Sequence, residues 1–158
     1  MQIAKLEQLQ YARELIQAKL RLSIVAALTN LTLEPLRKMW KEIHGERSPN
    51  GKLPESALSY VKTVQMVRNL SAIVLLHQRL HNTKEITPRN LLQTWRAYNA
   101  LLGQVDPSNR LDINAAYYAL RDVRSNQLTV MKCNNCRISY IYDRELSLTS
   151  HCPYCKSE

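Results

Sequence analysis

Residues 133–155 read CNNCRISYIYDRELSLTSHCPYC, and this stretch holds all four cysteines of the 158-residue chain. The cysteines form two C-x-x-C pairs, separated by the 15 residues from Arg137 to His151. Each pair makes a tight turn that directs two sulfurs at one point, and the loop is long enough to return the second turn to the first. Two such pairs are the usual source of the four soft ligands of a tetrahedral zinc ion.

The spacing predicts one structural zinc ion with four ligands: Cys133, Cys136, Cys152 and Cys155. Two disulfide bonds are the alternative, but nothing else in the sequence indicates an oxidising compartment. Four thiolates leave no coordination position open for water or substrate. We therefore expect the metal to stabilise a small fold and to do no chemistry.

Two β-rich segments, Leu128–Met131 and Ile138–Tyr142, bracket the first pair of cysteines. A strand, a thiolate turn, a second strand and a second thiolate turn make a zinc ribbon, which we place at residues 127–158. Residues 1–126 lack strand signals of similar strength, and the chain has 3 glycines and no phenylalanine. The predicted fold is mainly α: a helical bundle followed by a small C-terminal zinc ribbon.

Six stretches of the first 126 residues have the apolar spacing or the capping residues of helices. We expect a helix at each of these places: Ile3–Leu20; Ile24–Thr29, capped by Ser23; the stretch after the N-cap Thr32, ended by Gly45; Glu55–His81; Arg89–Leu102, opened by Pro88; and Ile113–Asn126, capped by Asp112.

The second and third expected helices, joined by a short turn, make a helix-turn-helix pattern. We expect the third helix to bury one stripe, made of Leu33, Leu36, Trp40 and Ile43. Its opposite stripe carries Glu34, Arg37, Lys38 and Lys41. In helix-turn-helix proteins the second helix of the motif enters the major groove of DNA, where its exposed side chains contact bases and phosphates. A solvated charged helix face is the alternative.

A turn-rich stretch, residues 45–54, follows this helix, and Arg47 and Lys52 flank its Asn50-Gly51 turn. Its position suits contact with a phosphate backbone, although a plain connector would have a similar composition. The candidate DNA contacts are Thr32, Arg37, Lys38, Lys41, Arg47 and Lys52. Among them, Arg37 and Lys38 are the expected base readers.

The net charge of +9 lies mainly outside the ribbon. Residues 1–50 hold 8 Lys/Arg and 5 Asp/Glu (+3), residues 51–100 hold 7 and 2 (+5), and residues 101–158 hold 7 and 6 (+1). A basic helical body without a basic tail indicates a surface for a phosphate backbone. Ordinary solubility charge is the alternative explanation.

Enzymatic and membrane functions find little support in the sequence. His77 and His81 have metal-ligand spacing, but Gln78 stands where a zinc protease needs glutamate. We find no nucleophile–base pair and no glycine-rich phosphate loop, so we do not expect an enzyme. The N-terminus has no signal-peptide pattern, and no stretch approaches the roughly 20 apolar residues of a membrane span. We expect a cytoplasmic protein.

Three features together resemble the FlhC family, which provides a subunit of the bacterial flagellar master transcription activator. They are the helical run from Arg21 to Gly45, the loop Ser48–Pro54 and the cysteine quartet. The resemblance implies a zinc-stabilised, DNA-binding subunit of a hetero-oligomer with an FlhD-like helical protein, which activates promoters with RNA polymerase. Related FlhC-like activators on mobile elements turn on conjugation genes, so the set of regulated genes stays open.

The alternative function is that of a protein–protein adaptor with a structural zinc ribbon. Its apolar helices and its ribbon would bind partners and would not contact DNA. The two hypotheses differ in one observable, because an adaptor forms its complexes regardless of DNA.

Overall fold

The computed structural model describes residues 2–155, which divide into two compact units. The first unit comprises the chain up to Leu53 together with Ile86–Leu92. The second comprises Pro54–Glu85 together with the chain from Gln93 onward. From the sequence we expect a helical body at residues 1–126 and a zinc ribbon at residues 127–158. That division is by function and not by packing, so it stays a prediction.

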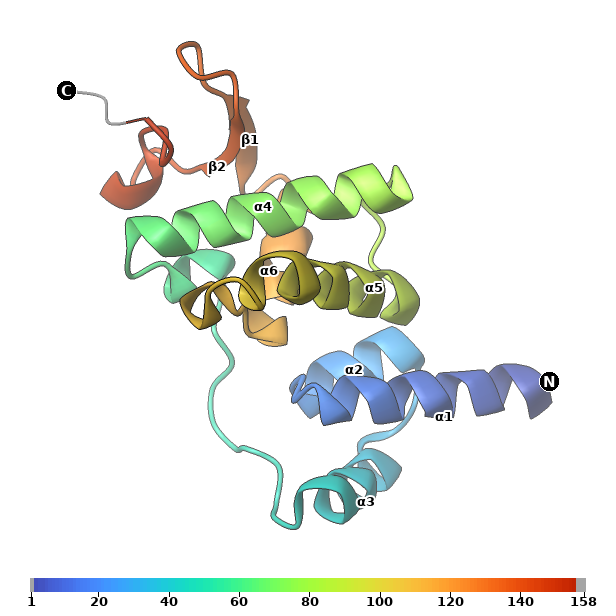
Figure 1. Ribbon diagram of the computed structural model, residues 1–158. Helices are drawn as coiled ribbons and strands as arrows, with labels where there is room; N and C mark the ends of the chain where they lie inside the picture. Colours follow the sequence, from blue (N-terminus) through green and yellow to red (C-terminus); the bar gives the residue numbers. More distant parts are fainter. Residues whose placement is uncertain (1, 156–158) are drawn as a thin grey trace. The chain divides into compact units, whose positions relative to one another are not determined.

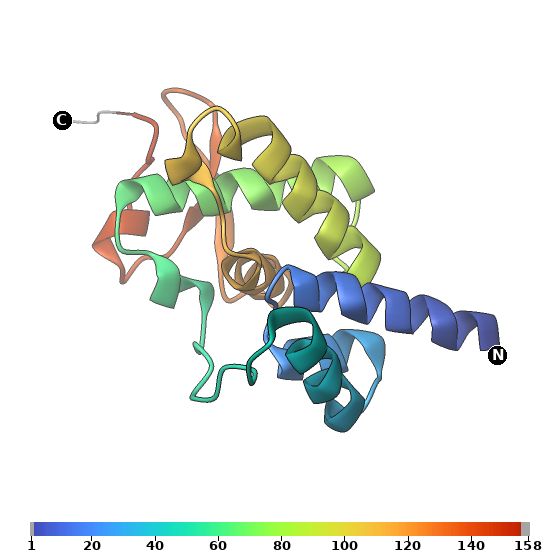
Figure 2. The same ribbon diagram turned by 60° about the horizontal axis from the view of Figure 1, so that its bottom comes forward.

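In the first unit, three helices pack against one another: α1 (Gln2–Gln17), α2 (Leu22–Thr29) and α3 (Leu33–His44). Figures 1 and 2 show them gathered into one group. Their shared core is made of fully or nearly fully buried side chains, among them Ala12, Leu15, Ile16, Val25, Leu36 and Trp40. The ring of His44 adds a polar link between α3 and α1, with its Nε2 2.8 Å from the carbonyl oxygen of Ile16.

The ends of these helices follow local backbone chemistry. Gly45 ends α3 in the left-handed region (φ 72°), as predicted, because glycine adopts that conformation without a steric penalty. The predicted Ser23 cap is wrong, since Ser23 lies inside α2. Arg21 is the residue that precedes this helix, and its carbonyl oxygen accepts the backbone N–H groups of Ile24 and Val25.

The second unit contains α4 (Val64–His81) and α6 (Ile113–Arg124), which pack on each other. The predicted helix over Glu55–His81 is too long at its start. Thr63 Oγ1 accepts the backbone N–H of Met66 and thereby sets the N-terminus of α4, and the short helix η1 (Ala57–Tyr60) precedes it. The predicted Asp112 cap of α6 is confirmed, since its carboxylate accepts the N–H of Asn114.

Helix α5 (Pro88–Tyr98) begins at the predicted proline but ends before Leu102. It continues as one wide π-helical turn, η2 (Asn99–Gly103), which is followed by the short helix η3 (Pro107–Asn109). The Asn99 carboxamide oxygen accepts the backbone N–H of Leu111 at 3.1 Å. These residues are 12 apart in the sequence, so the spacing of apolar residues in a helix cannot predict this bond.

Strands β1 (Thr129–Lys132) and β2 (Ser139–Tyr142) form an antiparallel pair, with Val130 opposite Ile141. This sheet packs on α4, where the backbone N–H of Ile141 donates to Ser71 Oγ at 2.9 Å. A short helix, η4 (Ser147–Thr149), also contacts α4. The described chain is therefore mainly helical with one small sheet, as predicted. None of the helices in residues 2–155 is long and apolar enough to cross a membrane.

Candidate metal centre and nucleic-acid interface

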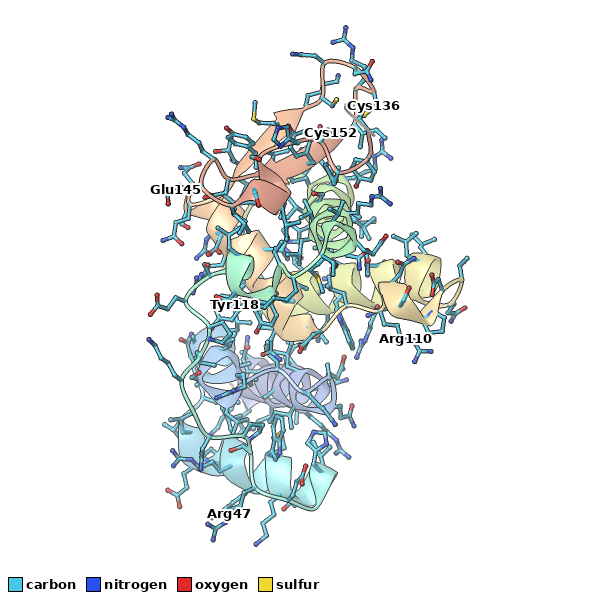
Figure 3. All side chains as sticks on the ribbon, turned by 90° about the vertical axis from the view of Figure 1, so that its left-hand side faces the viewer. Arg47, Arg110, Tyr118, Cys136, Glu145 and Cys152 are labelled. Carbon is cyan, nitrogen blue, oxygen red and sulfur yellow. The ribbon has the colours of Figure 1, made fainter. Side chains whose placement is uncertain are left out.

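The four cysteine sulfurs converge on one point of the second unit. All four Sγ atoms lie within 4.8 Å of one another, with Cys133 and Cys155 at 3.7 Å and Cys136 and Cys152 at 3.6 Å. Figure 3 labels one cysteine of each pair. A tetrahedral zinc ion with bonds of about 2.3 Å requires sulfur–sulfur distances of about 3.8 Å. A disulfide requires about 2.05 Å, so the free thiols fit one metal ion and not two disulfide bonds.

The first C-x-x-C turn presents backbone N–H groups to its own sulfur. Arg137, in the left-handed region at φ 66°, closes the turn by donating its N–H to the carbonyl oxygen of Cys133. The N–H groups of Cys136 and Asn135 lower the pKa of the Cys133 thiol to about 6, whereas burial raises the pKa of Cys152. Since metals bind the thiolate form, Cys133 is prepared for ligation near neutral pH.

Arg68 of α4 contacts both middle residues of the second C-x-x-C turn. Its Nε donates to the carbonyl oxygen of Pro153 at 2.7 Å. The hydroxyl of Tyr154 donates to the backbone oxygen of Arg68 at 3.4 Å, and the Arg68 guanidinium lies 6.0 Å from the Tyr154 ring centroid. Contacts with α4 therefore hold Pro153 and Tyr154 in place, and these two residues position the flanking Cys152 and Cys155. Arg68 was not among the residues predicted from the sequence.

A hollow of about 490 Å³, which we call the basic hollow, lies on the first unit beside α3. It is lined by Arg37, Lys38, Lys41, Arg47, Ser48 and Asn50. The structure thus brings together four of the six candidate DNA contacts, and the lining contains no acidic residue. Lys38 Nζ lies 3.9 Å from Glu34 Oε1, but both side chains are mostly exposed, so water screens this pair.

The remaining two candidates lie outside the lining of the hollow. Thr32 is exposed at the start of α3, where its side chain makes no capping hydrogen bond. Lys52 is exposed beside Gly51, whose carbonyl oxygen accepts from Arg21. Ser48 and Asn50 were not predicted, although both belong to the same turn-rich stretch as Arg47, which is labelled in Figure 3.

In residues 2–155, His77 and His81 have no third ligand-type side chain close enough to complete a metal site. His77 is 1% exposed, and burial followed by the nearby charge of His81 lowers its pKa to about 4. His81 Nε2 lies 3.1 Å from Thr94 Oγ1. Among residues 2–155, the group of histidine, cysteine and acidic side chains close enough to hold a metal is the cysteine quartet.

Comparison with known proteins matches nearly the whole sequence. A family model described as flagellar transcriptional activator (FlhC) covers residues 2–158. The flagellar transcriptional regulator FlhC of Pectobacterium carotovorum is 25% identical over 142 residues, which are 90% of this chain and 74% of the relative. The FlhC regulator of Variovorax paradoxus (strain S110) is 26% identical over 141 residues, 88% of this chain and 69% of the relative.

A third relative, the flagellar transcriptional regulator FlhC of Gallionella capsiferriformans (strain ES-2), is 22% identical over 155 residues, 97% of this chain and 85% of the relative. These similarities run through both compact units and include the cysteine quartet within the span of the family model. The family is one of transcriptional regulators, which are not a class of enzymes. The chain belongs to the FlhC family of flagellar transcriptional activators.

Proposed function

We propose that this chain is the DNA-binding subunit of a transcriptional activator that works at flagellar or conjugative-transfer promoters. The observation that carries the proposal is the basic hollow, where four cationic side chains from α3 and the following segment surround one space. Double-stranded DNA presents a regular array of phosphates, which such a surface attracts at long range and binds at short range.

Helix α3 would provide the base contacts and the following segment would provide phosphate contacts. Arg37 and Lys38 lie in the middle of α3, which follows α2 after a short turn, as in a helix-turn-helix. Lys41 and Arg47 lie near Gly45, which ends α3, and they would contact phosphates of the DNA backbone. Thr32 and Lys52, at the two ends of this region, would add further phosphate contacts.

The family resemblance supplies the proposed partners. We infer that the chain assembles with an FlhD-like helical protein in a hetero-oligomer, and that this assembly engages RNA polymerase in the cytoplasm. One zinc ion would be held by the cysteine quartet with a structural role, since four sulfurs complete its coordination.

Replacing Lys41 and Arg47 together by alanine tests the DNA interface. Loss of two phosphate contacts should weaken binding to promoter DNA by about tenfold or more at low salt. It should also reduce the slope of log affinity against log salt concentration by about 2, because each contact contributes about 0.9. Fluorescence anisotropy titrations of labelled promoter DNA at four salt concentrations measure both quantities.

The matched control replaces Lys5 and Arg13, two exposed cations of α1 that do not line the basic hollow. This variant has the same net charge as the first, so it corrects for long-range attraction. Equal losses of affinity and slope in the two variants would show that net charge, and not the hollow, determines binding.

The adaptor function has one observation in its favour. Ile3 and Leu6, in the first turns of α1, are 83% and 66% exposed and lie three residues apart on one side of the helix, where a partner could cover them. Capture of the neighbouring gene product by the tagged chain, with and without promoter DNA, separates the two functions. A stable complex that neither binds nor responds to DNA supports the adaptor and rejects the DNA-binding subunit.

A further inference from the structure

We propose that Asn135 is a positioning residue of the metal centre and joins its two halves. The backbone N–H of Asn135 donates to Cys133 Sγ at 3.4 Å, and its side-chain Nδ2 donates to Cys155 Sγ at 3.6 Å. One residue therefore binds a sulfur of each C-x-x-C turn. This inference rests on the proposed zinc site.

The two sulfurs that Asn135 contacts belong to turns that are far apart in the sequence. Cys133 and Cys155 are 22 residues apart in sequence, yet their Sγ atoms lie at 3.7 Å. Four thiolates around one divalent ion leave a net charge of −2 at the centre. N–H groups that donate to sulfur spread this charge and fix the direction of each ligand, as outer-shell partners do at other metal sites.

The chemistry of the asparagine side chain suits this task. Its carboxamide offers N–H donors, whereas an aspartate of the same size offers only acceptors and a negative charge beside the thiolates. The turn around Cys133 places the Asn135 backbone at one sulfur, which leaves the short side chain to reach the other. A residue needed only to form the turn would not require a donor at its tip.

The neighbouring residue provides a matched control. Asn134 belongs to the same C-x-x-C turn and is exposed like Asn135. Within residues 2–155, the side-chain amide that donates to a cysteine sulfur is that of Asn135 and not that of Asn134. Replacing each by alanine changes the same side chain at adjacent positions, and only one replacement removes a donor from a ligand.

The experiment measures zinc release from the full-length chain to a chromogenic chelator, for the parent and for N135A, N135D, N135Q and N134A. We expect about tenfold faster release from Asn135→Ala. Release from Asn135→Asp should be faster still, because it adds negative charge. Asn135→Gln, which retains the carboxamide, should release zinc more slowly than Asn135→Ala, and Asn134→Ala should match the parent. Far-UV circular dichroism confirms that each variant is folded.

A second readout reports on the ligands directly. In the cobalt-substituted chain, Asn135→Ala should shift the thiolate-to-cobalt charge-transfer bands, whereas Asn134→Ala should leave them in place. Equal release rates and spectra for the two alanine variants overturn the role of Asn135, as does a glutamine variant that behaves like the alanine variant. A parent chain that retains no zinc rejects the metal site itself, which is a different result from either of these.

Discussion

His77 is a buried ionisable group that lies beside a second histidine. Its ring lies 5.1 Å from that of His81, and its Nε2 has no hydrogen-bond partner among the described residues. With Lys84 and two side chains of α6, Leu120 and Val123, it lines a cavity of about 10 Å³. Burial first, and then the nearby charge of His81, oppose protonation of this histidine in the folded chain and lower its pKa.

We predict that this histidine makes the chain less stable in mild acid. Its folded pKa of about 4 lies below the ordinary 6.5, so the unfolded chain binds the proton more readily. Its contribution to stability is complete above pH 6.5 and declines as the pH falls towards 4, by about 1 kcal/mol per pH unit. Urea unfolding between pH 7 and pH 4.5 measures this slope.

A glutamine at position 77 is the control for that slope. His77→Gln keeps a polar side chain of similar length but does not titrate, so its free energy of unfolding should depend less steeply on pH over the same range. Identical slopes for the parent and the variant would assign the acid sensitivity to other groups.

Among the helices, the short η1 and the long α6 are joined by one carboxylate. Asp122 is fully buried, and its Oδ2 accepts the backbone N–H of Ala57 at 2.7 Å. Its Oδ1 accepts from Nε and Nη2 of Arg121, which in turn donates to the carbonyl oxygen of Glu55. The carboxylate thus fixes where the chain before α4 meets α6.

We expect Asp122→Ala to destabilise the second unit by about 3 kcal/mol. The change leaves the buried N–H of Ala57 without its acceptor and removes the ion pair of the half-buried Arg121 guanidinium, and such losses typically cost several kcal/mol. Asp106→Ala is the comparison, because that carboxylate is exposed and accepts from Ser108 in a surface turn. Thermal melts should show a large decrease in Tm for the first variant and little change for the second.

The sequence predicts helix ends well where one residue determines them. Gly45, Pro88 and Asp112 each mark an end correctly, because their own backbone or side-chain chemistry makes the end. The start of α4 was predicted too early, since the apolar pattern extends past Thr63 into η1. The capping bond at Thr63 is local, but choosing it over other starts depends on how η1 packs against α6.

In the candidate sites too, the sequence predicts local features but not contacts between distant residues. Spacing alone identifies the cysteine quartet, because each turn positions its own two sulfurs. Helical periodicity places Arg37, Lys38 and Lys41 on one side of α3. The contact of Arg68 with Pro153 spans 85 residues, and no local pattern can specify it.

For the chain as a whole, the two units should respond differently to loss of metal. Binding energy at a four-cysteine site is coupled to folding, and the ribbon is attached to α4 through Arg68 and Ser71. We predict that a chelator increases amide hydrogen exchange in β2 and in α4. Exchange in α1, α2 and α3, which share their own core, should change much less.

A variant with three of the four ligands provides the control for this experiment. Cys136→Ser should bind less than one zinc per chain, show raised exchange without chelator and respond little when chelator is added. Uniform deprotection of α1 to α6 after chelation would contradict a local effect of the metal. Full zinc content with unchanged melting in the serine variant would reject Cys136 as a ligand.

The bond between Arg68 and Pro153 also has a consequence for the order of protein synthesis. Its partners are 85 residues apart, so a ribosome adding about 5–20 residues per second makes Arg68 about 4–17 s before Pro153. During this interval the side of the nascent α4 that packs on the ribbon remains open to chaperones and to aggregation. The cysteines are made after α4, so a shortage of metal in the cell would prolong this vulnerable state.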